Sequence, residues 1–167
     1  MKKSILITSA LMAVLIPCAA TSATVTRIID GDTLEAREDG EVVRVRLVDI
    51  DAPEKSQAYG QRAKQKLIEL VKGADDFTVK STSKDRYGRV LGQVYVKRCQ
   101  PECLSYYVNA EMVKSGLAWA YRFHNKATSP AMAELETEAR KKKIGLWADP
   151  NAIEPWHYRQ REKMLSN

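Results

Sequence analysis

The sequence has few of the residues that bind soft metals. Among its 167 residues are only two histidines and three cysteines. The histidines, His124 and His157, lack the spacing relative to cysteines that zinc fingers show, so a zinc site is not expected. The sequence also lacks internal repeats, low-complexity segments and any linker that would mark a domain boundary. These absences exclude repeat architectures and favour a single domain.

Long apolar runs are absent too, apart from one near the N-terminus. The chain starts with Lys2 and Lys3, continues with an apolar run over residues 5–16, and then has small residues up to position 23. This order is typical of a secretory signal peptide. The run is shorter than the roughly 18 to 20 residues that span a bilayer. We therefore expect residues 1–23 to be a cleaved signal, the protein to be secreted or periplasmic, and no stable membrane insertion after signal removal.

The rest of the chain is expected to form one basic domain with a polar tail. Residues 24–150 have the length of a single domain, and residues 151–167 are rich in Arg, Lys and polar residues without a periodic pattern. The whole chain has 27 basic and 21 acidic residues, a formal charge of +6. The signal segment carries two lysines and no acid, which leaves +4. Such a charge favours a polyanionic partner, although it is also a common solubility feature. We take a monomer as the starting assumption.

Two of the three cysteines remain after signal cleavage. Cys99 and Cys103 flank the turn-forming Pro101, and export would bring them into an oxidising compartment. The pair predicts a disulfide, whose short loop would contribute about 2 kcal/mol in the chain-entropy model. Two free thiols are the alternative, because so short a loop restricts disulfide geometry.

The apolar pattern predicts an α+β protein that is mainly β. Five segments alternate as strands do, and apolar residues at helical spacing over residues 59–72 predict a helix after the third strand. This order is that of a five-stranded OB-type Greek-key barrel with about three helices. The expected strands are residues 25–29, 33–38, 42–47, 77–83 and 90–96, and the two further helices are residues 104–115 and 130–143.

Acidic residues come together at one end of the predicted sheet. Asp32 lies in the turn between the first two strands, and the return of the next hairpin would bring Asp49 and Asp51 to the same end. Separately, these acids would be read as an ordinary turn and a solvated loop. Together they are oxygen donors that suit a hard cation such as Ca²⁺ or Mg²⁺.

A basic turn joins the last two predicted strands. Residues 85–89 include Arg86, Tyr87 and Arg89. Alone, the turn would be a solvated hairpin tip. Beside a carboxylate-bound cation, its arginines and Arg46 supply forked donors that match phosphate. A cation with two arginines is a constellation for phosphoryl transfer.

Three of these segments, in this order, resemble the signature segments of the staphylococcal nuclease family. The resemblance covers about residues 25–148. The three segments are Asp30-Gly31-Asp32-Thr33, the acidic stretch from Arg46 to Glu54, and Asp85-Arg86-Tyr87-Gly88-Arg89. Further matches are Val108-Asn109, Gly116-Leu117-Ala118 and Gly145-Leu146-Trp147.

The resemblance implies a calcium-dependent nuclease that acts on DNA and RNA and leaves 3′-phosphate ends. Asp32, Asp51 and the backbone oxygen of Ala52 would bind Ca²⁺, with Ala52 standing where the family usually has Thr. Glu54 would be the general base or position the water. Arg46 and Arg89 would bind the scissile phosphate and stabilise its developing charge.

The resemblance also implies substrate-binding residues outside this centre. Arg86 would meet a terminal phosphate, and Tyr87 belongs to the same basic turn. Tyr121 and Phe123 stand near the positions of two family tyrosines, where an aromatic ring can stack on a base. Core packing is the alternative for these two. For the whole protein, the alternative is a noncatalytic OB module that binds nucleic acid.

Overall fold

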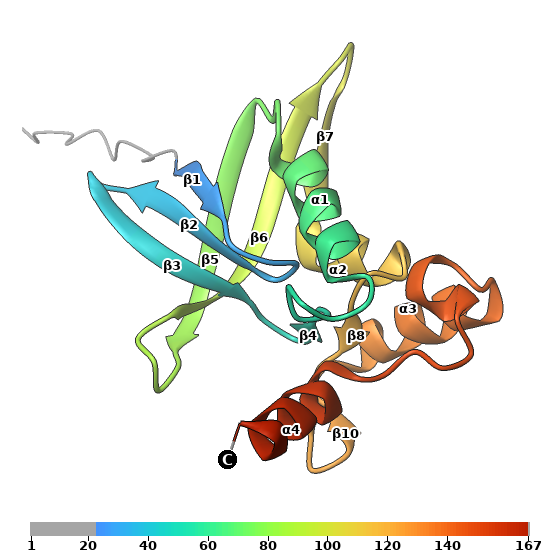
Figure 1. Cartoon of the computed structure of the whole chain (residues 1–167). Coiled ribbons are helices and arrows are strands. Elements are labelled where there is room, and N and C mark those ends of the chain that lie inside the picture. The colour runs from blue at the N-terminus through green and yellow to red at the C-terminus, as the bar shows by residue number, and fades with distance from the viewer. Residues whose placement is uncertain (1–22, 167) are drawn as a thin grey trace, which may run out of the picture.

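The computed structural model describes residues 23–166 (Figure 1). The predicted signal peptide, residues 1–23, therefore lies almost entirely outside the described residues. No helix in the described part of the chain is both long enough and apolar enough to cross a membrane. In Figure 1 the large sheet occupies one side of the molecule, α2 and α3 the other, and α1 lies between them.

The main sheet has six strands: five follow the order β1-β2-β3-β6-β5, and β7 pairs with β6 outside this order. The first three form an antiparallel meander, β3 then pairs with β6 in parallel, and β5 pairs with β6 antiparallel. Alternate side chains of β6 are buried, which is the period of two expected for a strand with one face on the core. The strands are β1 (Thr24–Ile28), β2 (Thr33–Glu38), β3 (Glu41–Leu47), β5 (Asp76–Lys84), β6 (Val90–Cys99) and β7 (Cys103–Tyr107).

Four helices accompany this sheet. Helix α1 follows the third strand, as predicted, and Ser129 caps α3 by accepting a hydrogen bond from the backbone N–H of Met132 at 3.4 Å. A single turn of 3₁₀ helix, η1 (Gly145–Ala148), lies between the last two helices. The α-helices are α1 (Gly60–Val71), α2 (Val108–Lys114), α3 (Pro130–Lys141) and α4 (Pro155–Leu165).

Short strands connect the sheet to the helices. Strand β4 (Ile50–Asp51) pairs antiparallel with β8 (Trp119–Ala120), and β9 (Arg122–Phe123) pairs with β10 (Lys126–Ala127). The β4–β8 pair ties the acidic segment after β3 to the chain between α2 and α3.

The mixed, mainly β architecture and the order of its long strands agree with the prediction. Closure into a barrel stays a prediction, since no ladder joins β1 to β5 within residues 23–166. The helix expected over residues 104–115 is wrong in its first four residues, 104–107. There, β7 (Cys103–Tyr107) pairs with β6, and Tyr107 stacks on Tyr95 with ring centroids 4.9 Å apart. Pairing with a neighbouring strand outweighs the helical spacing of the apolar residues, and aromatic residues favour strands. Residues 155–165 of the predicted tail form α4.

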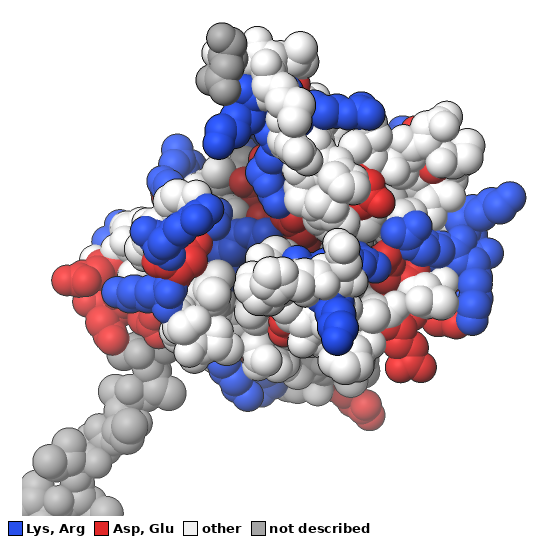
Figure 2. Space-filling view, turned by 90° about the horizontal axis from the view of Figure 1, so that it is seen from below, with Lys and Arg blue, Asp and Glu red and all other residues white. Residues whose placement is uncertain are grey.

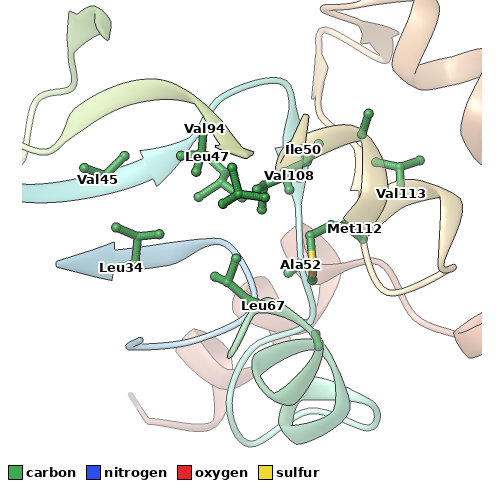
Figure 3. Packing of buried hydrophobic residues seen from close by; sticks show 14 of the residues in the cluster. Leu34, Val45, Leu47, Ile50, Ala52, Leu67, Val94, Val108, Met112 and Val113 are labelled. Atoms are coloured by element: carbon green, nitrogen blue, oxygen red, sulfur yellow. The ribbon is translucent and has the colours of Figure 1, made fainter. Parts of the chain in front are cut away.

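The core lies between the concave face of the sheet and helices α1 and α2 (Figure 3). Leu34, Val45 and Val94 from the sheet, Leu67 from α1 and Met112 from α2 are all fully buried. Burying each such side chain stabilises the fold by roughly 1.5–3 kcal/mol. This cluster packs the sheet, including the end at which the acidic residues lie, against the helices.

Two glycines let the chain after α2 meet the chain after α3. Gly116 and Gly145 both have positive φ angles, 64° and 61°. A side chain on Gly116 would collide with the carbonyl of Ile144, and one on Gly145 would collide with the carbonyl of Gly116. The backbone N–H of Leu146 donates to the Gly116 carbonyl at 2.9 Å across this contact. The close approach of the two backbones therefore explains why glycine occurs in the segments that contain Gly116 and Gly145.

Candidate active site

The acidic residues meet at the end of the β2–β3 hairpin. Thr33 pairs with Arg46 in this ladder, and the backbone N–H of Leu47 donates to the Asp32 carbonyl at 2.8 Å. The turn before β2 and the segment after β3 are thus adjacent, as the predicted register requires. Asp32 and Asp51 come from these two segments, and their residues are only 6% and 1% exposed.

Arg46 bridges the two buried carboxylates. Its Nη2 donates to Asp51 Oδ1 at 2.8 Å, and its Nη1 lies 3.2 Å from Asp32 Oδ2. The carbonyls of Leu47 and Ile50 accept hydrogen bonds from the same Nη1 at 3.0 and 2.9 Å. Both terminal nitrogens of the planar guanidinium are therefore engaged, an arrangement that suits the forked donors of an arginine.

Burial and clustered negative charge shift the pKa values of this group. Burial raises the pKa of Asp51, and the hydrogen bond from Arg159 opposes that rise without cancelling it. Burial and the nearby charge of Asp32 raise the pKa of Asp30 to about 6. Burial lowers the pKa of Arg46, but the charges of Asp32 and Asp51 outweigh burial and raise it above its usual value. Such a site favours additional positive charge.

The donor set fits a hard cation in type. Asp32, Asp51 and the carbonyl of Ala52 offer only oxygen, and the backbone N–H of Ala52 donates to Asp32 Oδ2 at 2.7 Å, which holds this segment against the turn. Within residues 23–166 no three acidic, histidine or cysteine side chains converge closely enough to form a complete cage. Asp49, expected at the same end, turns away. It has a φ of 63°, and its Oδ1 accepts a hydrogen bond from Thr128 Oγ1 at 2.7 Å.

Glu54 lies beside this pair and is held by a residue that sequence analysis missed. Its Oε1 is 2.7 Å from Nη1 of Arg159 on α4. The same guanidinium donates to both oxygens of Asp51, at 3.2 and 2.8 Å. Burial lowers the pKa of Arg159, but the hydrogen bonds and charges of Asp51 and Glu54 raise it well above its usual range. Because Arg159 lies in a polar segment without periodicity, no sequence pattern marked it.

The basic hairpin tip is built around Asp85. This carboxylate accepts hydrogen bonds from the backbone N–H groups of Tyr87 and Arg89 and from Arg89 Nε, the last at 2.7 Å. Tyr87 is 69% exposed, and the guanidinium carbons of Arg86 and Arg89 lie 4.9 and 5.6 Å from its ring centroid. The tip therefore presents an open surface of one aromatic ring and two cations.

Arg89 lies just outside the strand that neighbours that of Arg46. It directly precedes β6, where Arg46 is paired with Leu91. Since side chains alternate between the faces of a strand, Arg89 and Leu91 lie on one side, the side of Arg46. In the described structure Arg89 pairs with Asp85, and no ion pair joins it to the buried acids. The sheet places both arginines on one face without bringing Arg89 into contact with the carboxylates.

Tyr121 and Phe123 are surface residues, which removes core packing as their explanation. They are 37% and 62% exposed. Tyr121 directly follows β8, and its backbone N–H donates to the Asp49 carbonyl at 2.9 Å. The backbone at Tyr121 is thus joined to the acidic segment, and Phe123 follows two residues later in β9.

A buried glutamate that the sequence analysis missed supports this arrangement. Glu136 on α3 is 2% exposed and accepts a hydrogen bond from the backbone N–H of Ala120 in β8 at 2.8 Å. Arg122 and Arg140 balance its charge at 3.0 and 2.7 Å. Through the pairing of β8 with β4, this cluster holds the strand that carries Asp51.

Separately, Cys99 and Cys103 are joined by a disulfide at the start of β7, away from these acids.

The fold and the site together define a mixed α/β protein whose acids and arginines suit phosphate chemistry. A family model described as "Staphylococcal nuclease homologue" matches residues 44–149. The chain therefore belongs to the staphylococcal nuclease family.

Three individual relatives are similar to this chain over most of their length. The chain is 46% identical over 145 residues to "Micrococcal nuclease" of Shigella flexneri, covering 86% of this chain and 83% of the relative. It is 52% identical over 142 residues to "Protein ParB" of Escherichia coli, covering 81% and 77%. It is also 41% identical over 167 residues to an "Uncharacterized endonuclease" of Haemophilus influenzae, covering 97% and 88%.

Proposed function

We propose that this protein is an exported, Ca²⁺-dependent nuclease that hydrolyses the phosphodiester bonds of DNA and RNA and leaves 3′-phosphate ends. The observation that carries the proposal is the bridge that Arg46 forms between the buried carboxylates of Asp32 and Asp51, with Glu54 beside it. Membership of the staphylococcal nuclease family and the names of two relatives, a micrococcal nuclease and an uncharacterized endonuclease, support a nuclease activity. The N-terminal signal pattern supports export.

The residues have separate roles in the proposed reaction. Asp32, Asp51 and the carbonyl of Ala52 hold the Ca²⁺ ion, which when bound neutralises phosphate charge. Glu54 accepts a proton from the attacking water. The water oxygen forms the new bond to phosphorus, the bond from phosphorus to the 5′ oxygen breaks, and the leaving oxygen takes up a proton from solvent water. The phosphate stays on the 3′ side.

The arginines and aromatic residues bind the substrate. Arg46 and Arg89, on one face of neighbouring strands, bind the scissile phosphate and stabilise the charge that grows on it. Arg86 meets a further phosphate. The exposed rings of Tyr87, Tyr121 and Phe123 stack on bases, a contact worth about 1–3 kcal/mol each and independent of base identity. Stacking of this kind favours unpaired strands.

A chelation experiment tests this function. The protein is incubated with heat-denatured DNA in the presence of Ca²⁺, with excess chelator, and with chelator followed by excess Ca²⁺, while circular dichroism follows the fold. We expect cleavage only where Ca²⁺ is free, with an unchanged fold in all three. Undiminished cleavage in excess chelator contradicts the metal assignment. Binding of DNA without any cleavage under all conditions supports instead a noncatalytic nucleic-acid-binding module.

A further inference from the structure

Helix α4 lies against the proposed active site with little apolar packing. Of its eleven residues only Pro155 is buried. Polar contacts attach the helix and the residues before it to the loop that follows Glu54. Tyr158 donates its hydroxyl to Ser56 Oγ at 3.1 Å, and the amide of Gln57 donates to the Ile153 carbonyl at 2.6 Å. A helix held in this way is easily released, because no large buried surface opposes its departure.

The strongest of these contacts joins α4 to the acids of the site. Arg159 donates to Glu54 and to both oxygens of Asp51, while its own side chain remains 45% exposed. On the face seen from below in Figure 2, acidic side chains lie in the middle with Lys and Arg side chains around them, and further acidic side chains lie at the edges. One guanidinium thus cross-links the carboxylates to which we assign cation binding and proton transfer. It comes from outside residues 44–149, the segment that the family model matches.

Arg159 occupies lone pairs of the Asp51 carboxylate that a bound cation would need. The two oxygens of a carboxylate have about four lone-pair sites. Three contacts of Asp51 with Arg46 and Arg159 take up most of these. Arg159 also places a positive charge 2.8 Å from Asp51 Oδ2. A divalent cation on that carboxylate would be repelled by the guanidinium at short range, where solvent screens charge poorly.

We propose that Arg159 is an internal counter-ion that competes with the divalent cation for Asp51, so that cation binding releases α4 from the active site. This inference rests on the proposed cation-dependent function. Without the cation, Arg159 balances the charge of the acids and covers them. Because coupling between two binding events is reciprocal, docking of α4 weakens cation binding by the same factor by which the cation weakens docking.

Calorimetric titration of the purified protein with Ca²⁺, in the absence of nucleic acid, tests the competition. Arg159→Gln should bind Ca²⁺ at least about tenfold more tightly than the wild type, as expected for removing one positive charge at this distance. Arg159→Lys keeps the charge and should stay within about threefold of the wild type. Arg161→Gln removes the same charge from the same helix at an exposed position, for which no ion pair occurs in the described structure, and should also change the affinity by less than about threefold.

Hydrogen exchange of residues 155–165 tests the release. We expect Ca²⁺ to accelerate exchange in this helix of the wild type. In Arg159→Gln, exchange should already be fast without Ca²⁺ and should not respond to it. Equal Ca²⁺ affinities for the wild type and Arg159→Gln, or α4 protection that Ca²⁺ leaves unchanged in the wild type, would overturn the inference. Failure of every variant to bind Ca²⁺ would overturn both the cation assignment and this inference, which separates that failure from a failure of the competition alone.

Discussion

At the scale of single residues, the site depends on the shape of the guanidinium group as much as on its charge. Arg46 contacts two carbonyls and two carboxylates at once. Each partner lies in a different direction, so a compact ammonium group cannot reach all of them. Arginine is therefore required here for both structure and chemistry.

Replacing either proposed phosphate-binding arginine by lysine should remove most of the activity. Arg46→Lys and Arg89→Lys keep the charge but lose the planar fork, and we expect kcat to fall by about 10² or more in each. Initial rates on denatured DNA at saturating Ca²⁺ measure this. Arg27→Lys is the matched control, because Arg27 forms a comparable forked contact with Glu35 on the exposed part of the sheet. Rates within a few-fold of wild type for both site variants would disprove their proposed roles.

The stability of the hairpin tip should depend on the ionisation of Asp85. Burial raises the pKa of Asp85, but the hydrogen bonds from Arg89 and Tyr87 outweigh it and hold the pKa below its usual 3.8. A lowered pKa in the folded state contributes stability that is complete above pH 3.8 and is lost as the pH falls through the lowered value. Asp85→Asn should therefore reduce the free energy of unfolding by about 1 kcal/mol at pH 7.

Urea denaturation of the wild type and Asp85→Asn across this pH range checks that prediction. The difference between the two proteins should shrink steadily below pH 3.8, where the wild-type carboxylate becomes protonated. A difference that is constant with pH, or that grows as the pH falls, would show that the ionised carboxylate does not stabilise the tip.

The meeting of Asp32 and Asp51 could be predicted from the sequence, whereas the orientation of Asp49 and the contacts of residues outside the motifs could not. The Asp32 turn and the segment ending at Glu54 are local patterns, and the hairpin between them is enough to bring them to the same end of the sheet. Arg159 and Glu136 act through contacts with residues 108 and 16 positions away, respectively. The spacing of residues along the sequence does not indicate such contacts.

At the scale of elements, ladder register brings the site together. Pairing of Thr33 with Arg46 and of Asp51 with Trp119 joins three segments at one end of the molecule. The first pairing could be predicted from two adjacent turn signals. The second could not, because β4 and β8 have only two residues each and show no alternation. The pairing of β7 with β6 is likewise not visible in the sequence, which is why a helix is expected over residues 104–107 where the structure has a strand.

The buried charge of Glu136 should stabilise the β8 end of the site. Glu136→Gln keeps the size of the side chain but leaves Arg122 and Arg140 without their shared anion, so we expect a loss of about 2–3 kcal/mol in the free energy of unfolding. Glu138→Gln is the matched control on the same helix, where the glutamate is exposed and paired with Lys141. It should leave the free energy of unfolding nearly unchanged, because exposed ion pairs contribute little. Equal effects in urea denaturation of the two variants would contradict a supporting role for Glu136.

At the scale of the whole molecule, export and the disulfide belong to one prediction. We expect the exported protein to begin near Thr24 and to contain the Cys99–Cys103 bridge that the structure forms. Intact-mass analysis of the native exported protein, with and without an alkylating reagent, measures both features. A retained N-terminal segment would disprove signal cleavage, and two alkylatable thiols would disprove the bridge.

The overall architecture was more predictable than its details. Five alternating segments and one amphipathic helix are long patterns, and they indicated the order of the main strands and the place of α1. Barrel closure and the position of α4 depend on contacts between the ends of the chain and its middle. A polar helix such as α4 has no apolar stripe, so its docking is set by ion pairs that only a three-dimensional structure brings together.

The central claim is that Glu54, beside the acids bridged by Arg46, carries out the proton transfer of a nuclease. The most direct test is the initial rate of cleavage of denatured DNA at saturating Ca²⁺ by Glu54→Gln, with DNA binding measured in parallel and Glu138→Gln as the control for loss of one exposed carboxylate. The account predicts that kcat falls by about 10² to 10⁴ in Glu54→Gln, with binding largely retained, and stays within about twofold of wild type in Glu138→Gln. A Glu54→Gln rate within a few-fold of wild type would contradict it.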